Sequence, residues 1–272
     1  MKPILTLLWC IIAMISLSTS AQAQFWNKVK SHAADVVNGK IDDAVNGGKD
    51  GETEKSTKAT ETQKAAIQVQ TPFDFRAGSE VIFEDNFEQD AVGKFPHGWK
   101  TNASGSVVTV PGVSGRWFLL DDEATYKLDS LLSMPQDFTI EFDIFASADQ
   151  ASDLSTVYFG FTRDNSVSSY LDGVGIAGAA LYYMNDDQYY TASSDVDKHH
   201  FGSFNLVNTL NNPLHVSIAV KGTHMKMYLG RTRILDAEMF QPGSRKYFFC
   251  SSSLRYEHGA KVMIGNVKIA KG

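Results

Sequence analysis

The stretch LHVSIAVKGTHMKMYLGRTRILDAEMF, residues 214–240, decides the fold class of this chain. LHVSIAVK and HMKMYL each alternate apolar residues with polar or small ones, and Gly222-Thr223 lies between them as a turn. A period of two residues is that of a β-strand with one buried face. The stretch therefore predicts antiparallel strands joined by tight turns.

The same pattern extends over residues 72–272. Short alternating runs are separated by Gly, Asn, Asp and Pro, and no helix-period segment of ordinary length interrupts them. Strands of this number and length predict an all-β fold, a large antiparallel β-sandwich. The expected strands comprise residues 81–84, 106–110, 116–120, 138–145, 156–162, 174–184, 188–192, 214–221, 224–229, 232–236, 247–251 and 261–270.

Three segments precede the sandwich. Residues 1–23 carry Lys2, an apolar run and the small-residue site Ala21-Gln22-Ala23, which is the layout of a secretory signal peptide cleaved before Gln24. The apolar run is short for a bilayer span, so no integral membrane segment is expected after cleavage, with an uncleaved anchor as the alternative. Residues 24–46 have apolar side chains at steps of three and four and predict an amphipathic helix. Residues 47–71, rich in Lys, Glu and Thr, predict a flexible linker.

Charge and cysteine content exclude some functions. The formal net charge is −6, and loss of Lys2 with the signal peptide makes it −7. An acidic surface repels phosphates, so nucleic acid is not an expected partner. Cys250 is the one cysteine left after cleavage, so no intramolecular disulfide is expected, and its apolar surroundings predict a buried core residue.

Two sets of motifs resemble known families. FTIEFDIF (residues 138–145) and LHVSIAVKGTHMKMYLGRTRILD (residues 214–236) resemble the core strand and late hairpin of concanavalin A-like (laminin-G-like) jelly rolls, which implies that fold. FDFRAGSEVIFEDNFEQDAVGKFPHGW (residues 73–99) and MIGNVKIAKG (residues 263–272) resemble exported Bacteroidetes proteins of the outer-membrane protein A family. The sequence lacks the peptidoglycan-binding domain of that family, so peptidoglycan anchoring is not expected.

Glu141 and Asp143 resemble the start of the E-x-D-x-x-E signature of laminarinase-type glycoside hydrolases. Their spacing puts both carboxylates on one face of a strand. Retaining hydrolysis needs a second carboxyl group nearby as the acid/base. The signature places it at Ala146, or at Phe145 in a shorter register, and neither side chain can transfer a proton. The sequence therefore predicts no catalytic residue and no enzyme.

Two further motifs are interpreted as structural. Gly173-Val-Gly175-Ile-Ala-Gly178 is a literal G-x-G-x-x-G, but it stands in an all-β setting without the helix that a dinucleotide site requires. Glycines at a strand start or a bulge explain it better. The adjacent His199 and His200 would face opposite sides of a strand, so no zinc site is expected.

Calcium is the one ion that the sequence suggests. Glu84, Asp85 and Asp90 crowd into FEDNFEQDAVG, and oxygen-rich loops suit Ca²⁺. The resemblance to concanavalin A-like sandwiches, which often carry a structural calcium, implies the same. Solvated loop carboxylates are the alternative interpretation. No other cofactor is expected.

Paired tyrosines form the candidate ligand site. Tyr182-Tyr183 and Tyr189-Tyr190 flank MNDDQ, which is interpreted as a hairpin turn. Each pair sends one ring to each face of a sheet, so two rings can share an open face. Sugars stack on such rings, and amide and carboxylate groups beside them bind hydroxyls; packing is the alternative role. The predicted ligand-binding residues are Tyr182, Tyr183, Asn185, Asp187, Tyr189 and Tyr190.

These features together predict an exported, non-catalytic binding module for a glycan or another cell-envelope component. The expected location is the periplasm, the outer membrane or the exterior. One alternative is a structural or interaction protein that binds a protein partner through the helix of residues 25–45. The other is a glycoside hydrolase with an unrecognised site.

Overall fold

The structure, a computed structural model, describes residues 73–185 and 188–272. The predicted signal peptide, helix and linker lie outside the described residues. Within this part the chain forms strands and three short 3-10 helices but no α-helix, so the all-β prediction is confirmed. The same residues include no helix of the length and hydropathy needed to cross a membrane. The 3-10 helices are η1 (Ala151–Asp153), η2 (Tyr183–Asn185) and η3 (Val207–Thr209).

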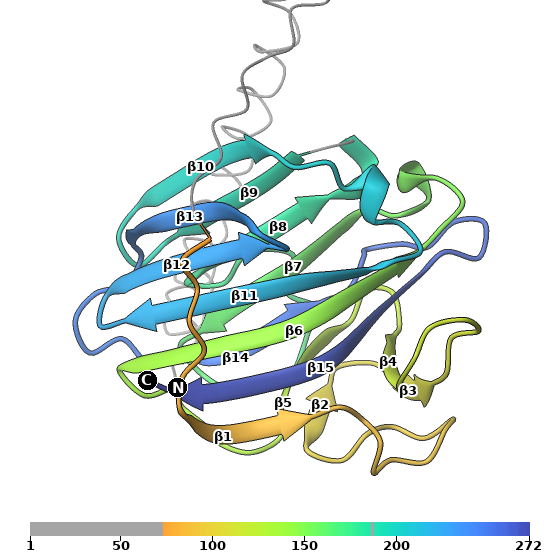
Figure 1. Cartoon of the computed structure of the whole chain (residues 1–272), viewed down its shortest axis with the longest axis horizontal. Coiled ribbons are helices and arrows are strands. Elements are labelled where there is room, and N and C mark those ends of the chain that lie inside the picture. Colours follow the sequence, from red (N-terminus) through yellow and green to blue (C-terminus); the bar gives the residue numbers. More distant parts are fainter. Residues whose placement is uncertain (1–72, 186–187) are drawn as a thin grey trace, which may run out of the picture. The chain divides into compact units, whose positions relative to one another are not determined.

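Two antiparallel sheets face each other, with the eight-stranded sheet in front in Figure 1. Its strands, in order across the sheet, are β13 (Thr232–Glu238), β12 (His224–Leu229), β11 (Pro213–Lys221), β6 (Asp137–Ser147), β15 (Lys261–Lys271), β4 (Trp117–Leu120) and β3 (Gly105–Val108), with β1 (Glu80–Asp85) paired to β15. The seven-stranded sheet has the order β10 (Lys198–Ser203), β9 (Gln188–Ser193), β8 (Ala177–Tyr182), β7 (Thr156–Thr162), β14 (Tyr247–Ser251), β5 (Thr125–Leu128) and β2 (Trp99–Thr101).

The core lies between the sheets and follows from alternation. On β6, Phe138, Ile140, Phe142 and Ile144 are at most 1% exposed, and the residues between them face outward. The ring of Phe142 meets the ring of Phe159 at 5.4 Å and that of Phe248 at 5.5 Å, both edge to face. Such pairs add to the apolar area that holds the two sheets together.

Each of the twelve expected runs contains a strand, and the turn at Gly222-Thr223 is confirmed, with Gly222 at φ 61°. Three strands were not expected. β2 has only three residues, and β10 reads KHHFGS, an exposed edge strand with polar residues on both faces. β5 is wholly buried although it contains Lys127, whose ammonium donates to Thr162 Oγ1 at 2.8 Å. Burial lowers the pKa of Lys127.

The leading segment, residues 73–79, crosses the outer face of the eight-stranded sheet from β13 to β1, as the orange trace in Figure 1 shows. The Asp74 carboxylate accepts hydrogen bonds from Lys226 Nζ and from the Tyr228 hydroxyl, both at 2.6 Å. Farther along, the backbone N–H of Gly78 donates to Thr139 Oγ1 at 2.9 Å. The segment therefore occupies part of the face that also carries Glu141 and Asp143.

The reactivity of the Cys250 thiol is a direct measure of core packing. Its side chain is 2% exposed on the inner side of β14, and burial raises the pKa of its thiol. Because the thiolate is the reactive form, native protein should not be alkylated by iodoacetamide at pH 8, whereas protein in guanidinium chloride should be. Mass spectrometry of the peptide containing Cys250 measures this; rapid native alkylation would contradict the buried placement.

Candidate functional site

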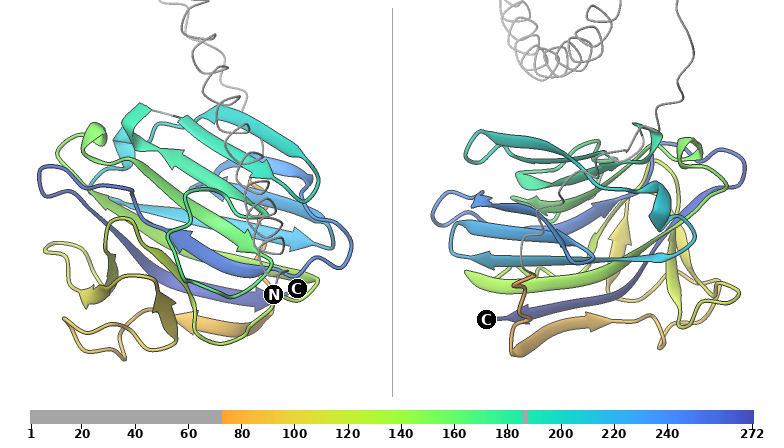
Figure 2. Two further views of the ribbon diagram at one scale, coloured as in Figure 1. Left: turned by 180° about the vertical axis from the view of Figure 1, so that it is seen from behind. Right: turned by 45° about the horizontal axis from the view of Figure 1, so that its top comes forward.

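The outer face of the seven-stranded sheet is half covered and half open. The covering loop, residues 163–176, connects β7 to β8 and passes in front of β14 in the left view of Figure 2. The Tyr158 hydroxyl donates to Asp172 Oδ1 at 2.8 Å, and the Tyr170 hydroxyl donates to the carbonyl of Ser252 at 3.0 Å. Beneath the loop, Phe249 is fully buried and Tyr158 is 6% exposed. This half of the face is closed to a ligand.

Glycines let the covering loop lie flat on the sheet. A Cβ atom on Gly178 would stand 2.3 Å from the carbonyl oxygen of Phe159 and 2.7 Å from that of Val174. Gly160, directly opposite Gly178 on β7, is equally crowded. Gly178 therefore serves close backbone packing at the start of β8, which confirms the structural interpretation of the G-x-G-x-x-G run.

The open half carries the aromatic patch, which consists of Tyr182, Tyr190, Phe201 and His199. The rings of Tyr190 and Phe201 lie 4.5 Å apart, and Phe201 lies nearly parallel to Tyr182 at 6.4 Å. The His199 ring stands 6.4 Å from Tyr190. Phe201 is 51% exposed, which is unusual for so large an apolar side chain.

Strand register assembles this patch. β8 and β9 form the expected hairpin, and Phe201 on β10 is the direct cross-strand partner of Tyr190 on β9. Alternation turns the other tyrosine of each pair inward, so Tyr183 is fully buried and Tyr189 is 7% exposed. These two rings are core residues and do not reach the open face.

Polar groups border the aromatic patch. Gln188 and Ser203 are exposed and form the next cross-strand pair on the same face of β9 and β10. Asn185 is exposed in η2, while Asp187 lies outside the described residues. Burial raises the pKa of Tyr182 to about 12, so its phenol stays neutral and keeps its O–H donor at physiological pH.

The sequence pattern singles out Tyr182 and Tyr190 of this patch but not Phe201, His199 and Ser203, because it does not predict β10 as a strand; that the patch binds a ligand stays a prediction. The available signal was weak. In KHHFGS the residues His199, Phe201 and Ser203 alternate with Lys198, His200 and Gly202, but an edge strand exposed on both sides lacks the apolar period that marks a buried face.

The expected calcium residues do not converge on one point. Asp85 accepts the backbone N–H of Phe87 and the indole N–H of Trp99, each at 2.8 Å. Asp90, 5% exposed, accepts the backbone N–H of His97 at 3.0 Å. Glu84 is exposed on β1. The carboxylates of Asp85 and Asp90 therefore organise the turn after β1, and a structural calcium there stays a prediction.

Among the described residues, one group of side chains brings three potential metal ligands within 4.8 Å of one another: Asp153, Glu257 and His258. Asp153 Oδ1 already binds Gln150 Nε2 at 2.9 Å and His258 Nδ1 at 2.8 Å. The group is explained by these hydrogen bonds, which join η1 to the loop before β15.

Glu141 and Asp143 share the outer face of β6, as predicted, and His215 of β11 lies between them. Its Nδ1 is 2.7 Å from Asp143 Oδ1, and its Nε2 is 3.5 Å from Glu141 Oε1. Phe145 is 2% exposed, packed against Trp117, and Ala146 faces the core at 1%. The two positions at which the hydrolase signature places its acid/base are thus held by buried apolar side chains.

His215 should make stability depend on pH. The hydrogen bond with Asp143, helped by both carboxylate charges and opposed by burial, raises the pKa of His215 above 6.5. A group whose pKa is higher in the folded state than in the unfolded state stabilises the folded protein when it is protonated. This stabilisation is complete below the pKa of the unfolded state and is lost as pH rises through the pKa of the folded state. The half-exposed ring limits the effect to about 1 kcal/mol or less. Urea unfolding from pH 5.5 to 8.5 should show the deficit of His215→Gln shrinking as pH rises; a constant or growing deficit would contradict it.

Comparison with known proteins identifies the fold alone. No protein-family model matches the chain, and no curated protein matches it either. The Ca²⁺-bound exoplasmic/lumenal domain of VIP36 is 10% identical with a TM-score of 0.50, over 71% of this chain and 90% of that chain. The carbohydrate-binding module CBM66 from Bacillus subtilis is 17% identical with a TM-score of 0.41, over 64% of this chain and 96% of that chain. A sialidase is 14% identical with a TM-score of 0.47, over 72% of this chain and 19% of that chain.

The described part of the chain is a concanavalin A-like β-sandwich, as its likeness to the VIP36 domain shows. Other solved forms of the VIP36 domain hold mannose or the oligosaccharide Man3GlcNAc, which is a property of that protein. The resemblance to the outer-membrane protein A family stays a prediction.

Proposed function

We propose that the protein is an exported, non-catalytic binding module that binds a glycan of the cell envelope on the aromatic patch of β8, β9 and β10. The observation that carries the proposal is the cluster of Tyr182, Tyr190 and Phe201 on an open sheet face, with Phe201 half exposed. The signal peptide predicted for residues 1–23 supports export.

The patch suits a sugar by shape and chemistry. Its rings stand on adjacent strands about 5 Å apart, which is close to the length of one pyranose ring. The C–H faces of sugars pack on aromatic rings, while hydroxyls need hydrogen bonds at the edges. The phenols of Tyr182 and Tyr190 and the side chains of Gln188 and Ser203 supply those hydrogen bonds.

Two features favour binding over catalysis. Among the described residues, the carboxylate close to the patch is that of Asp172, which accepts a hydrogen bond from the Tyr158 hydroxyl, whereas glycoside hydrolysis of the usual kind needs two carboxyl groups. Glu141 and Asp143 lie on the other sheet, with His215 between them and buried apolar side chains where the signature places an acid/base. The alternative partner site on the helix of residues 25–45 stays a prediction.

The test is a glycan array probed with the labelled protein, followed by thermal unfolding with each positive glycan, in calcium and in EDTA. A ligand specific for the folded state, present at a hundred times its dissociation constant, adds about 2.7 kcal/mol of stability. At least one glycan class should bind saturably and raise the melting temperature. Absence of any glycan-dependent shift across the array would overturn the proposal. A shift lost in EDTA would place calcium in the protein as well.

A further inference from the structure

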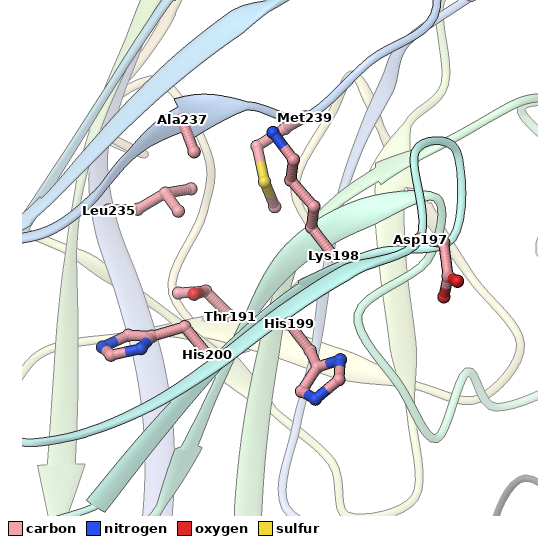
Figure 3. A pocket seen from close by; sticks show the side chains of 8 residues that line it. All are labelled: Thr191, Asp197, Lys198, His199, His200, Leu235, Ala237 and Met239. Carbon is pink, nitrogen blue, oxygen red and sulfur yellow. The ribbon is translucent and has the colours of Figure 1, made fainter.

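A cleft opens between the free edges of the two sheets. Edge strand β10 of one sheet and edge strand β13 of the other are its two sides, as Figure 3 shows. Its volume is about 310 Å³, at the small end of ligand sites. One wall consists of Leu235 and Ala237 on β13 and of Met239, which follows that strand. The opposite side is formed by Thr191 on β9 and by Lys198, His199 and His200 on β10. The hydroxyl of Ser193, which donates to the carbonyl of Met239 at 2.6 Å, joins the two sides near one end.

Thr191 is the unexplained group in this cleft. The residue is 1% exposed, and its Oγ1 has no hydrogen-bond partner. Figure 3 shows its side chain pointing into the space below Leu235. A buried hydroxyl without a partner destabilises a protein, because its hydrogen bonds to water are lost and no hydrogen bond within the protein replaces them. A polar ligand atom would supply the missing partner if the exposed side chains of His200 and Lys198 shifted to admit it.

Charge and polarity define the class of ligand. One wall is apolar, and the side chains of the opposite rim are donors: the ammonium of Lys198 and the imidazole of His200. Asp197 is the one carboxylate that lines the cleft, and it stands at the far side of Lys198 in Figure 3. Glu238, next to the wall on β13, bonds to Thr223 and His224 on the outer face, and the charge of Lys198 also contributes to lowering the pKa of Glu238.

We propose that this cleft binds a small monocarboxylate with an apolar body, such as an aromatic acid. The body packs on Leu235 and Met239, a carboxylate oxygen accepts a hydrogen bond from Thr191 Oγ1, and Lys198 provides the counter-charge. The cleft and the aromatic patch lie on opposite faces of β9, because Tyr190 and Thr191 are consecutive and face opposite sides; His199 borders both sites. The proposal does not rest on glycan binding.

The test follows methionine methyl signals of the ¹³C-methyl-methionine-labelled protein during titration with benzoate, and with benzyl alcohol as the uncharged match. The Met239 signal should shift and saturate with benzoate, at a dissociation constant between about 0.1 and 10 mM for a ligand of this size. Met263, packed with Trp117 and Phe145 on an outer face, is the internal control and should not move. An unmoved Met239 signal, or equal affinity for benzyl alcohol, would overturn the proposal.

Two variants locate the binding. Thr191→Val keeps the shape of the side chain and should weaken benzoate about fivefold or more, while the melting temperature stays or rises by roughly 2–4 °C as the unpartnered hydroxyl is lost. Lys198→Gln should weaken benzoate about threefold to tenfold and leave benzyl alcohol unchanged. Leu131→Ala, which removes a 79% exposed side chain outside both sites, is the control and should bind benzoate normally. Full benzoate affinity in Thr191→Val would contradict the assignment.

Discussion

Phe142→Ala should lower the free energy of unfolding by about 3–5 kcal/mol, the range found when a buried aromatic ring is truncated. Phe142 has no exposed surface and contacts the rings of Phe159 and Phe248 from the opposite sheet. Its loss would leave a cavity at the point where the two layers meet. The free energy of unfolding of many domains is only about 5–15 kcal/mol, so the variant should be close to unfolding at 37 °C.

Urea denaturation followed by tryptophan fluorescence measures this loss. Phe201→Ala is the matched control, since it removes the same ring from an exposed edge strand and should cost less than about 1 kcal/mol. Comparable losses for the two variants would mean that Phe142 does not lie in the core between the sheets.

The second large effect concerns ligand binding. Once a glycan is identified, Tyr190→Ala should weaken it at least tenfold, because a central aromatic anchor typically contributes about 1.4 kcal/mol or more. Tyr190 has Phe201 on one side and His199 on the other, so its ring is the middle of the patch. Isothermal titration calorimetry gives the change in dissociation constant.

Two control variants distinguish the loss of the aromatic ring from the loss of the hydroxyl group and from a general loss of stability. Tyr190→Phe keeps the stacking surface and should retain most of the affinity. Leu131→Ala removes a 79% exposed apolar side chain that is not part of the patch and should leave binding unchanged. A Tyr190→Ala protein with full affinity would show that the glycan binds elsewhere.

The layered architecture could be predicted from the sequence because alternation survives wherever one face of a strand is buried. It is clear in β6 and β11, whose inner residues are all apolar. β5 escapes the prediction because TYKL has only four residues: Tyr126 and Leu128 face the core, but two apolar positions are too few to mark a period. The ammonium of Lys127, on the other face, donates to Thr162 and Asp164 from elsewhere in the chain. The pattern also predicts the end of the covering loop as strand, since Val174, like Leu171, is apolar and packs on the outer surface of the sheet.

The candidate site was half predictable. Alternation alone implies that one ring of each tyrosine pair faces outward, but the choice of Tyr182 and Tyr190 depends on which face meets the core. Phe201 joins them only through the register of β9 with β10, where it pairs with Tyr190. The contact of His215 with Glu141 and Asp143 could not be predicted either, because it depends on β11, which is distant in sequence, lying beside β6 in the sheet.

Hydrogen–deuterium exchange with the bound glycan, read by mass spectrometry, tests the central claim most directly. If the glycan lies on the aromatic patch, amides of β9 and of the edge strand β10 (residues 188–203) should exchange more slowly when it is bound. Residues 137–147 and 213–221, which carry Glu141, Asp143 and His215, should exchange at an unchanged rate. Protection of those strands with none at residues 188–203 would place the ligand on the other sheet and contradict the account.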